Sequence, residues 1–113
     1  MSERGRHAEE LAAAFLHQQG LKLVARNYRC RFGEIDLIAR DGKTLVFVEV
    51  RMRTSNAFGG AAASITAAKR KKLLRTARHY LSGVARPPAC RFDALLISGP
   101  RHSVEWIKNA FGE

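Results

Sequence analysis

The chain has 113 residues, of which 46% are hydrophobic, a size and composition that suit one folded domain over residues 1–113 and exclude wholesale disorder. Lysine and arginine number 20 against 10 acids, and the net charge of +10 favours a polyanionic partner such as nucleic acid. No run of about 18 apolar residues occurs, and the first residues lack the apolar segment of a signal peptide. We therefore expect no membrane association and a cytoplasmic protein. Cys30 and Cys90 are isolated, so we expect reduced, half-buried thiols and no zinc site.

The first expected element is a helix over residues 2–19, which Gly20 ends. Apolar residues recur along it at helical spacing, at Ala8, Leu11, Ala12, Phe15 and Leu16. Glu9 lies at the edge of this stripe, from which it can reach a site beside the sheet, whereas Glu10 points to solvent. The alternative for Glu9 is a solvated glutamate that the helix dipole favours.

Residues 21–30 are expected to form the first strand, with a polar and basic second half. Arg26, Arg29 and Arg31 are interleaved with Tyr28, a composition common on surfaces that face nucleic acid. Solvated charges on an edge strand are the alternative explanation for each of these arginines.

Residues 33–51 are expected to form a β-hairpin around Asp41 and Gly42. A two-residue loop places Asp36 opposite Phe47, and a four-residue loop over 41–44 places it opposite Glu49. In both registers the same side chains share each face, because side chains alternate with period two. One face carries Glu34, Asp36, Phe47, Glu49 and Arg51. The other face, expected in the core, carries Ile35, Leu37, Val46, Val48 and Val50.

Acids within these apolar strands are costly unless they are paired, hydrogen-bonded or bound to a cation. As cross-strand or diagonal neighbours, Asp36 and Glu49 would lie roughly 4.5 to 8 Å apart at Cβ. One hard cation could bridge the two carboxylates, which predicts a site for Mg²⁺ or Mn²⁺, with Glu9 as a third acid.

An irregular connection over 53–63 should be mobile at the rim of this site and become ordered on a bound strand. Ser64 or Thr66 can then cap a second helix that runs to about residue 83. Its buried stripe is expected at Leu73, Leu74, Ala77, Tyr80 and Leu81. Its other face is basic and free of acids, so its like charges repel one another, and a bound polyanion would relieve this repulsion. The candidate nucleic-acid contacts are Arg26, Arg29, Arg31, Arg53, Lys69, Lys71, Lys72 and Arg75.

Residues 91–98 are nearly all apolar, which predicts a buried central strand. Asp93 within it is expected to pair with Arg91 or with a backbone amide. Residues 104–108 should form a short last strand, followed by a tail that Phe111 pins to the core.

The sequence Gly33-Glu34-Ile35-Asp36, followed after the turn by Glu49-Val50-Arg51, resembles the metal-binding core of the PD-(D/E)xK, or restriction-endonuclease-like, nucleases. Most of the chain is similar to the small bacterial YraN family, through residues 5–10, 26–29, 33–39, 45–51, 91–93 and 109–111. The resemblance implies an α/β fold with a restriction-endonuclease-like core in αβββαβ order, a final short strand, and a central mixed sheet flanked by helices.

The resemblance also implies a Mg²⁺-dependent endonuclease in which Asp36 and Glu49 bind the metal and Glu9 adds an acid from the first helix. Arg51 stands where the superfamily pattern has a lysine. Arginine stays charged and cannot serve as a base, although it can grip a phosphate. Similarity to junction-resolving enzymes implies DNA, including branched DNA, as the substrate, and a homodimer.

Two alternatives remain for the function. Arg51 favours a catalytically weak nucleic-acid-binding protein that keeps the nuclease fold. A structural accessory protein bound to another macromolecule is the other, although it leaves the acids within the strands unexplained.

Overall fold

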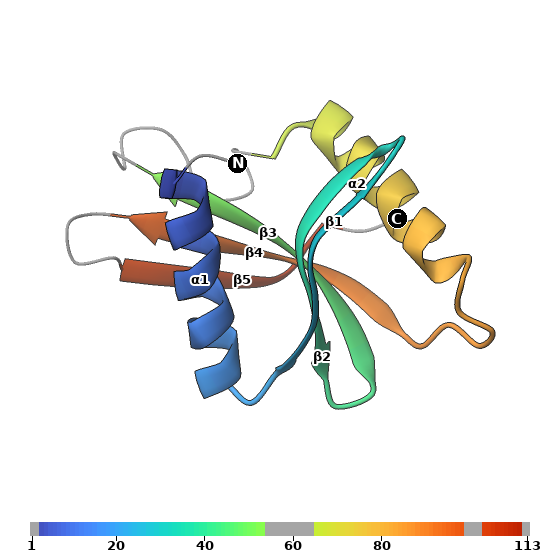
Figure 1. Ribbon diagram of the computed structural model, residues 1–113, viewed down its shortest axis with the longest axis horizontal. Helices are drawn as coiled ribbons and strands as arrows, with labels where there is room; N and C mark the ends of the chain where they lie inside the picture. Colours follow the sequence, from blue (N-terminus) through green and yellow to red (C-terminus); the bar gives the residue numbers. More distant parts are fainter. Residues whose placement is uncertain (1–2, 54–64, 99–102, 112–113) are drawn as a thin grey trace.

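The computed structural model describes residues 3–53, 65–98 and 103–111, with the backbone alone for residues 3–6 and 53. Within these ranges the elements are α1 (Glu3–Gln18), β1 (Lys22–Cys30), β2 (Gly33–Asp41), β3 (Thr44–Arg53), α2 (Ala67–Leu81), β4 (Cys90–Ser98) and β5 (Ser103–Phe111) (Figure 1). This order confirms the predicted α/β class with a restriction-endonuclease-like core. The connection expected at 53–63 lies outside the described residues, apart from the backbone of Arg53.

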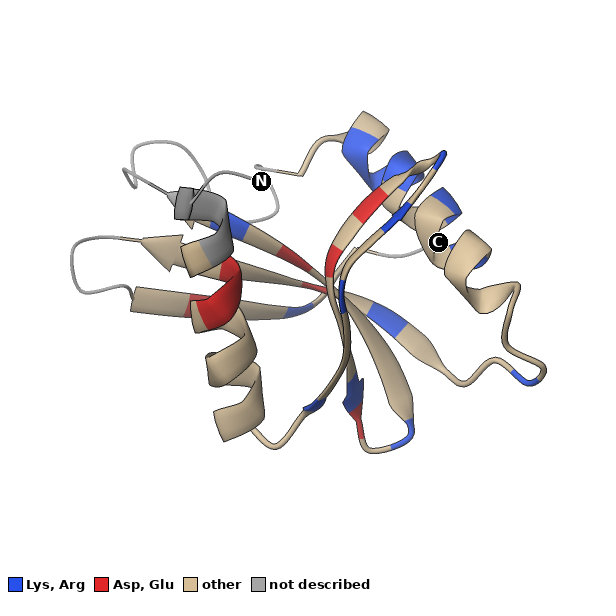
Figure 2. Cartoon of the chain, viewed as in Figure 1, with Lys and Arg blue, Asp and Glu red and all other residues tan. Residues whose placement is uncertain are grey.

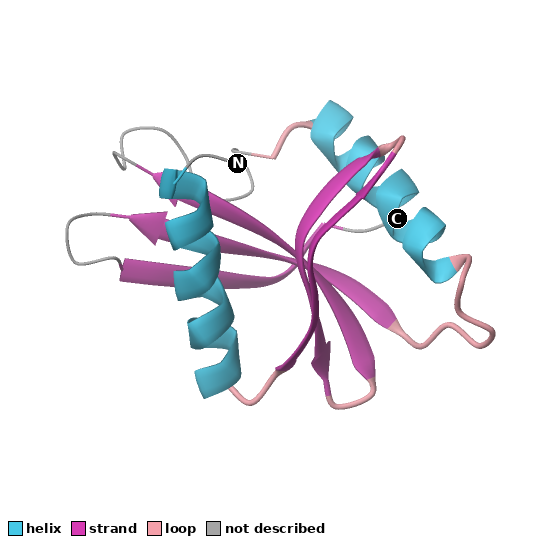
Figure 3. Ribbon diagram, viewed as in Figure 1, coloured by secondary structure: helices cyan, strands magenta, loops and turns pink. Residues whose placement is uncertain are grey.

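The strands form one mixed sheet in the order β1-β2-β3-β4-β5, with β3 and β4 parallel and the other pairs antiparallel. The two helices lie over separate parts of the sheet (Figures 1 and 3). Each packs on its own cluster of buried side chains. Ala12 and Leu16 of α1 pack with Val48 of β3, whereas Leu73 of α2 packs with Phe47. Adjacent residues of β3 point to opposite faces, so the two helices cover opposite faces of the sheet. No helix within the described ranges combines the length and apolar character needed to cross a bilayer.

Helix α1 follows the predicted stripe closely. Ala8, Ala12 and Leu16 are buried, and Leu11 and Phe15 pack half-buried against the same cluster. Gly20 adopts a φ of +90°, which a glycine tolerates just past a helix end. Glu9 is only 7% exposed, while Glu10 is exposed, as their places around the helix predicted.

Helix α2 begins after Thr66, whose hydroxyl accepts the Lys69 N–H at 3.1 Å and so caps the first turn. Leu73 and Ala77 of its predicted stripe are buried. The sequence did not predict burial of Thr76, which is fully enclosed. Its hydroxyl donates to the Lys72 carbonyl at 2.7 Å, so the buried polar group is satisfied within the helix.

The β2–β3 hairpin adopts the register in which Asp36 comes opposite Glu49. Leu37 pairs with Val48, and Asp41 pairs with Thr44, which leaves a two-residue turn at positions 42 and 43. Of the two predicted alternatives, the two-residue loop at Asp41 and Gly42, with Asp36 opposite Phe47, is wrong. The four-residue loop over 41–44 has the right register but is too long. Beyond the Leu37–Val48 pair, the Asp36 carboxylate accepts the N–H of Val50 at 2.9 Å.

The predicted division of the hairpin into two faces is wrong at Ile35. This side chain belongs to the cluster under α2, whereas Leu37, two residues on, belongs to the cluster under α1. The neighbouring strand β1 is distorted opposite this segment, where Asn27 lies between the partners of Leu37 and Ile35. β1 is irregular between Leu23 and Ala25, and Asn27 has a φ of +51°. Simple alternation fails across this twisted segment.

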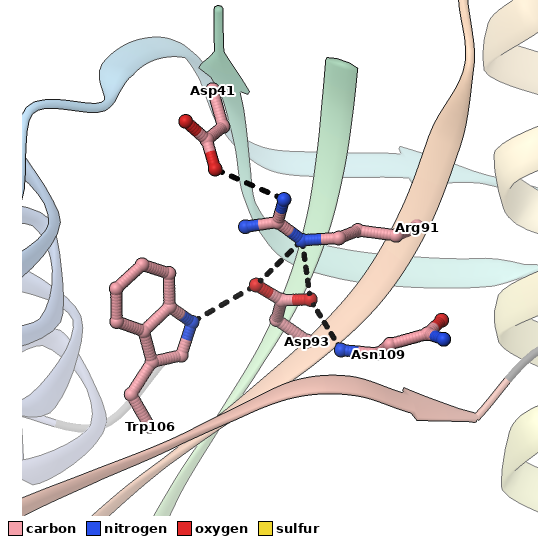
Figure 4. Close-up of polar contacts among 5 residues, drawn as sticks. All are labelled: Asp41, Arg91, Asp93, Trp106 and Asn109. Atoms are coloured by element: carbon pink, nitrogen blue, oxygen red, sulfur yellow. Dashed lines mark hydrogen bonds and ion pairs between the residues drawn. The ribbon is translucent and has the colours of Figure 1, made fainter.

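Strand β5 is longer than predicted and reaches Phe111. Asn109, at a φ of +53°, bulges the strand so that Phe111 still pairs with Phe92. Asp93 fills the bulge and accepts hydrogen bonds from the Asn109 N–H and the Trp106 Nε1–H, both at 2.9 Å (Figure 4). The Arg91 Nε donates to it at 3.0 Å. Both predicted partners of Asp93 are thus present, together with Trp106.

The two cysteines are free thiols in different settings. Cys30 is half-buried, as expected, but Cys90 is exposed. Cys90 opens β4 at the end of the sheet, where its thiol donates to the Pro88 carbonyl at 3.3 Å.

Asp93→Asn should lower the free energy of unfolding by about 2–4 kcal/mol. The change removes the buried anion of the Arg91 guanidinium, and it turns an amide NH₂ toward groups that are themselves hydrogen-bond donors. Asp41→Asn is the matched control. Asp41 binds the same guanidinium at 3.0 Å but is 39% exposed, so its loss should cost less than about 1 kcal/mol. Urea unfolding at pH 7 measures both variants, and equal losses would contradict this account.

Candidate metal centre

Three carboxylates from two elements converge beside the twisted part of the sheet. Glu9 of α1 and Glu34 and Asp36 of β2 each place one oxygen within 4.8 Å of the others. Glu9 is buried, and Glu34 and Asp36 are half-buried. Glu34 and Asp36 come together on β2 although simple alternation fails at Ile35 between them, and Glu9 reaches them from α1.

Glu49 of β3 lies outside this group of three oxygens but beside it, on the neighbouring strand. It is 6% exposed, and its charge interacts with those of Asp36 and Glu34. The β2–β3 register explains this proximity, because continuing it one residue beyond its last pair, Leu37–Val48, brings Asp36 opposite Glu49. We call Glu9, Glu34, Asp36 and Glu49 the acid cluster.

Two cations flank the acid cluster. The Lys69 Nζ of α2 lies 3.8 Å from the Glu49 Oε1, and the Arg51 Nε lies 3.4 Å from the same oxygen. The Arg51 Nε has no aligned hydrogen-bond acceptor among the described residues, although the atom is buried. The contact is therefore a Coulombic one, which leaves a donor available.

Crowding and burial shift the acids toward their protonated forms. Burial, and after it the charge of Asp36, raises the pKa of Glu49 to about 7, although Lys69 and Arg51 oppose the rise. Burial also raises the pKa of Asp36, which the Val50 N–H counteracts, and that of Glu9, where Asp36 adds to the effect. Like charges gathered in a partly desolvated space produce these shifts.

Asn27 connects β1 to the acid cluster. Its side chain hydrogen-bonds to Glu9 and favours the charged carboxylate. Its Oδ1 is buried and has no partner among the described residues. A carboxylate only accepts hydrogen bonds, so the Asn27 amide nitrogen serves Glu9 and the oxygen is left as one more acceptor. Buried acceptors lacking a donor are uncommon, and a cation or an ordered water would satisfy this one.

The structure brings together all four residues predicted for catalysis, namely Glu9, Asp36, Glu49 and Arg51. Sequence reasoning placed Glu34 on the right face without assigning it to the metal, and it assigned Lys69 only to phosphate contact. Asn27 was missed altogether. The residue type gave a signal for its left-handed backbone, since asparagine is enriched among the non-glycine residues that adopt this conformation.

The other residues predicted to contact nucleic acid lie on two exposed surfaces. Arg26 and Arg29 are exposed on the edge strand β1, and Arg31 is exposed at the β1–β2 turn. Lys71, Lys72 and Arg75 are exposed on α2. Arg29 also pairs with Glu34 at 3.3 Å. The side chain of Arg53 lies outside the described part. Figure 2 shows basic residues along α2 and the β1–β2 hairpin, and acidic segments on α1, β2 and β3.

The mixed sheet, the two flanking helices and the acid cluster define an α/β protein with a restriction-endonuclease-like core. The chain belongs to the uncharacterised protein family UPF0102, whose family model matches residues 8–97. It is 66% identical over 111 residues to a UPF0102 protein of Nitrosomonas europaea, covering 97% of this chain and 94% of that protein. It is 61% identical over 109 residues to one from Nitrosospira multiformis (96% and 92% covered) and 49% identical over 112 residues to one from Psychromonas ingrahamii (99% and 92% covered).

The metal-free protein should lose stability as the pH rises from about 4.5 to 7. The pKa of Glu49 is about 7 in the folded state and near 4.5 when unfolded, so the folded state binds more protons in this window. Glu49→Gln should therefore flatten the pH dependence and raise the melting temperature at pH 8 by several degrees. Thermal unfolding in EDTA between pH 4.5 and 8 measures this. Glu10→Gln, at an exposed site on α1, should reproduce the wild-type profile. A Glu49→Gln profile parallel to the wild type would refute the assignment.

Proposed function

We propose that this protein is a Mg²⁺-dependent endonuclease that hydrolyses phosphodiester bonds in DNA. The observation that supports this most is the convergence of Glu9, Glu34 and Asp36, with oxygens within 4.8 Å, in a chain of net charge +10. Such a cluster opposes the electrostatics of folding, because the acids repel one another and are partly desolvated. A basic protein that gathers its acids at one point has a use for concentrated negative charge there.

The donor set suits a hard divalent cation. Glu9, Glu34, Asp36 and Glu49 offer carboxylate oxygens, and the Asn27 Oδ1 is a further oxygen without a donor. Among the residues that the structure describes, no cysteine or histidine belongs to this group, which argues against zinc. Mg²⁺ or Mn²⁺ bound there would supply the positive charge that polarises a phosphodiester for attack by water.

The cations beside the acid cluster would act on the substrate. Arg51 keeps its charge at every physiological pH and has a free Nε–H, so it would bind a phosphate oxygen and stabilise developing negative charge. Lys69 places an ammonium against Glu49. In the superfamily pattern the lysine stands two residues after this glutamate on the same strand, which is position 51 here. We assign Lys69 the role of holding Glu49 in place and donating to the attacking water or to the phosphate.

A second candidate is a nucleic-acid-binding protein with little or no catalysis, and Arg51 in place of lysine favours it. The ammonium of Lys69 weakens that argument, because α2 supplies from the other side of the site what the strand lacks. The proposed partner is DNA in both cases. Branched substrates and a homodimer belong to the first proposal, through the likeness to junction-resolving enzymes.

Cleavage of branched and single-stranded DNA in Mg²⁺ or Mn²⁺ tests the proposal. Asp36→Asn and Glu49→Gln should each reduce the cleavage rate by at least about a hundredfold, since even outer partners of a metal site change activity by that order. Glu10→Gln is the control and should cleave normally. Cleavage that persists in an Asp36→Asn/Glu49→Gln double variant would point to a contaminant, and DNA binding without cleavage in the wild type would support the second candidate.

The role of Lys69 is tested by Lys69→Met against Lys71→Met, which removes an equal charge on the exposed face two residues away. Lys69→Met should lower kcat about 10²- to 10³-fold, the usual effect of losing one charge-stabilising donor, while Lys71→Met should mainly raise KM. Arg51→Lys should change kcat little if Lys69 supplies the ammonium. A large gain in activity from Arg51→Lys would instead identify arginine as the defect and overturn this role for Lys69.

A further inference from the structure

A chain of ring contacts runs from the β1–β2 turn into the core. The Phe32 ring lies edge-on to His79 of α2, with ring centroids 6.0 Å apart. The Tyr28 hydroxyl and the His79 Nδ1 are 2.5 Å apart and share a hydrogen bond. Tyr28 also meets Tyr80 at 5.1 Å, and Tyr80 meets the buried Phe47 at 6.1 Å. We call Tyr28, Arg31, Phe32 and His79 the turn cluster.

The outer end of this chain is open to solvent. Arg31 and His79 are exposed, and Phe32 is half-buried at the turn. The Arg31 guanidinium carbon lies over the Phe32 ring, 4.8 Å from its centroid. A guanidinium plane and an aromatic ring are the two kinds of surface on which proteins stack unpaired nucleobases.

The turn is held firmly in place, so it presents these groups in a fixed arrangement. The Phe32 N–H donates to the Cys30 Sγ at 3.4 Å. Gly33 packs so tightly on α2 that a Cβ there would lie 3.1 Å from the Thr76 Oγ1 and 3.8 Å from the Lys72 Cβ. A preformed site binds with a smaller entropy cost than one that must be ordered by its ligand.

The charge around the turn cluster suits the phosphates on either side of a stacked base. Arg31, Lys72 and Arg75 are exposed and basic, and α2 carries no acid. Helix α2 also links this region to the acid cluster. Lys69 contacts Glu49, and His79 lies ten residues further along, about 15 Å at 1.5 Å per residue. That span equals about four nucleotides of B-form rise, and fewer along a stretched strand.

We propose that the turn cluster is a stacking site for an unpaired nucleobase, a few nucleotides from the phosphate that reaches the acid cluster. Stacking requires a free base face, which a continuous duplex does not offer. The position of the stacked base relative to the acid cluster rests on the proposed function. The inference gives the site its substrate class, which is nucleic acid with a single-stranded segment beside the bond to be cut.

Binding without metal tests the turn cluster separately from catalysis. Oligonucleotides that contain 2-aminopurine, single-stranded and as a matched duplex, are titrated with protein in EDTA. Phe32→Leu, which keeps an apolar side chain without a π face, should weaken single-strand binding about five- to a hundredfold and change duplex binding by less than about twofold. Phe15→Leu is the control, because it removes an aromatic ring from α1, and it should change neither single-strand nor duplex binding. Wild-type binding should also quench the 2-aminopurine emission.

Phe32→Tyr retains the π face and should bind like the wild type, which guards against misfolding of the leucine variant. Equal losses on single strand and duplex, or no loss in a folded Phe32→Leu protein, would show that the rings merely fasten the turn to α2 and would overturn the proposal. The same oligonucleotide made of RNA tells which sugar the site accepts, and dependence on Phe32 is required with at least one of the two. Because EDTA prevents metal-dependent cleavage, a failed nuclease assay would leave this result intact.

Discussion

Mutual repulsion among four carboxylates, held where α1, β2 and β3 meet, is the constraint on which the functional part of this structure depends. The cluster forms only because the β2–β3 register sets Asp36 against Glu49 and because α1 packs close enough to bring in Glu9. Lys69, Arg51 and the Val50 N–H offset part of the repulsion, yet the pKa of Glu49 still rises to about 7. Folding alone gives no reason to assemble such a group.

The same sheet contains a second buried acid with the opposite character. Asp93 is fully enclosed, but three donors satisfy it, one of them the charged Arg91 guanidinium (Figure 4). It closes the bulge of β5 and joins β4 to β5. The contrast separates two uses of a buried carboxylate. The protein itself supplies donors for the hydrogen bonds that Asp93 can accept. The oxygens of the acid cluster keep unused lone pairs, which a cation that also binds a phosphate could use.

Much of this arrangement follows from the sequence, because it rests on local rules. Helical spacing placed Glu9 at the edge of a buried stripe, and strand alternation placed Asp36 and Glu49 on one side in either hairpin register. Thr66 as a helix cap and β4 as a buried strand were equally local predictions. The order of elements confirms the class of fold that the resemblance implied, and the family match confirms the family.

The parts that the sequence did not reveal depend on distortions or on contacts between distant elements. Asn27 has a left-handed backbone in β1, opposite the segment where Ile35 leaves the face that alternation assigned to it. Lys69 looked like one lysine among many on a basic helix until the packing of α2 brought it against Glu49. Asn109 extends β5 through a bulge whose cost Asp93 offsets from another strand. No sequence pattern around Asn27, Lys69 or Asn109 marks these residues, and only the assembled sheet shows what they do.

The hydrogen bond from the Val50 N–H to Asp36 has a spectroscopic consequence. A backbone amide that donates to a carboxylate changes its magnetic environment when that carboxylate gains a proton or shares its charge with a cation. Val50 is thus a natural NMR reporter at the heart of the acid cluster, sensitive to the ionic state of the site without any introduced label.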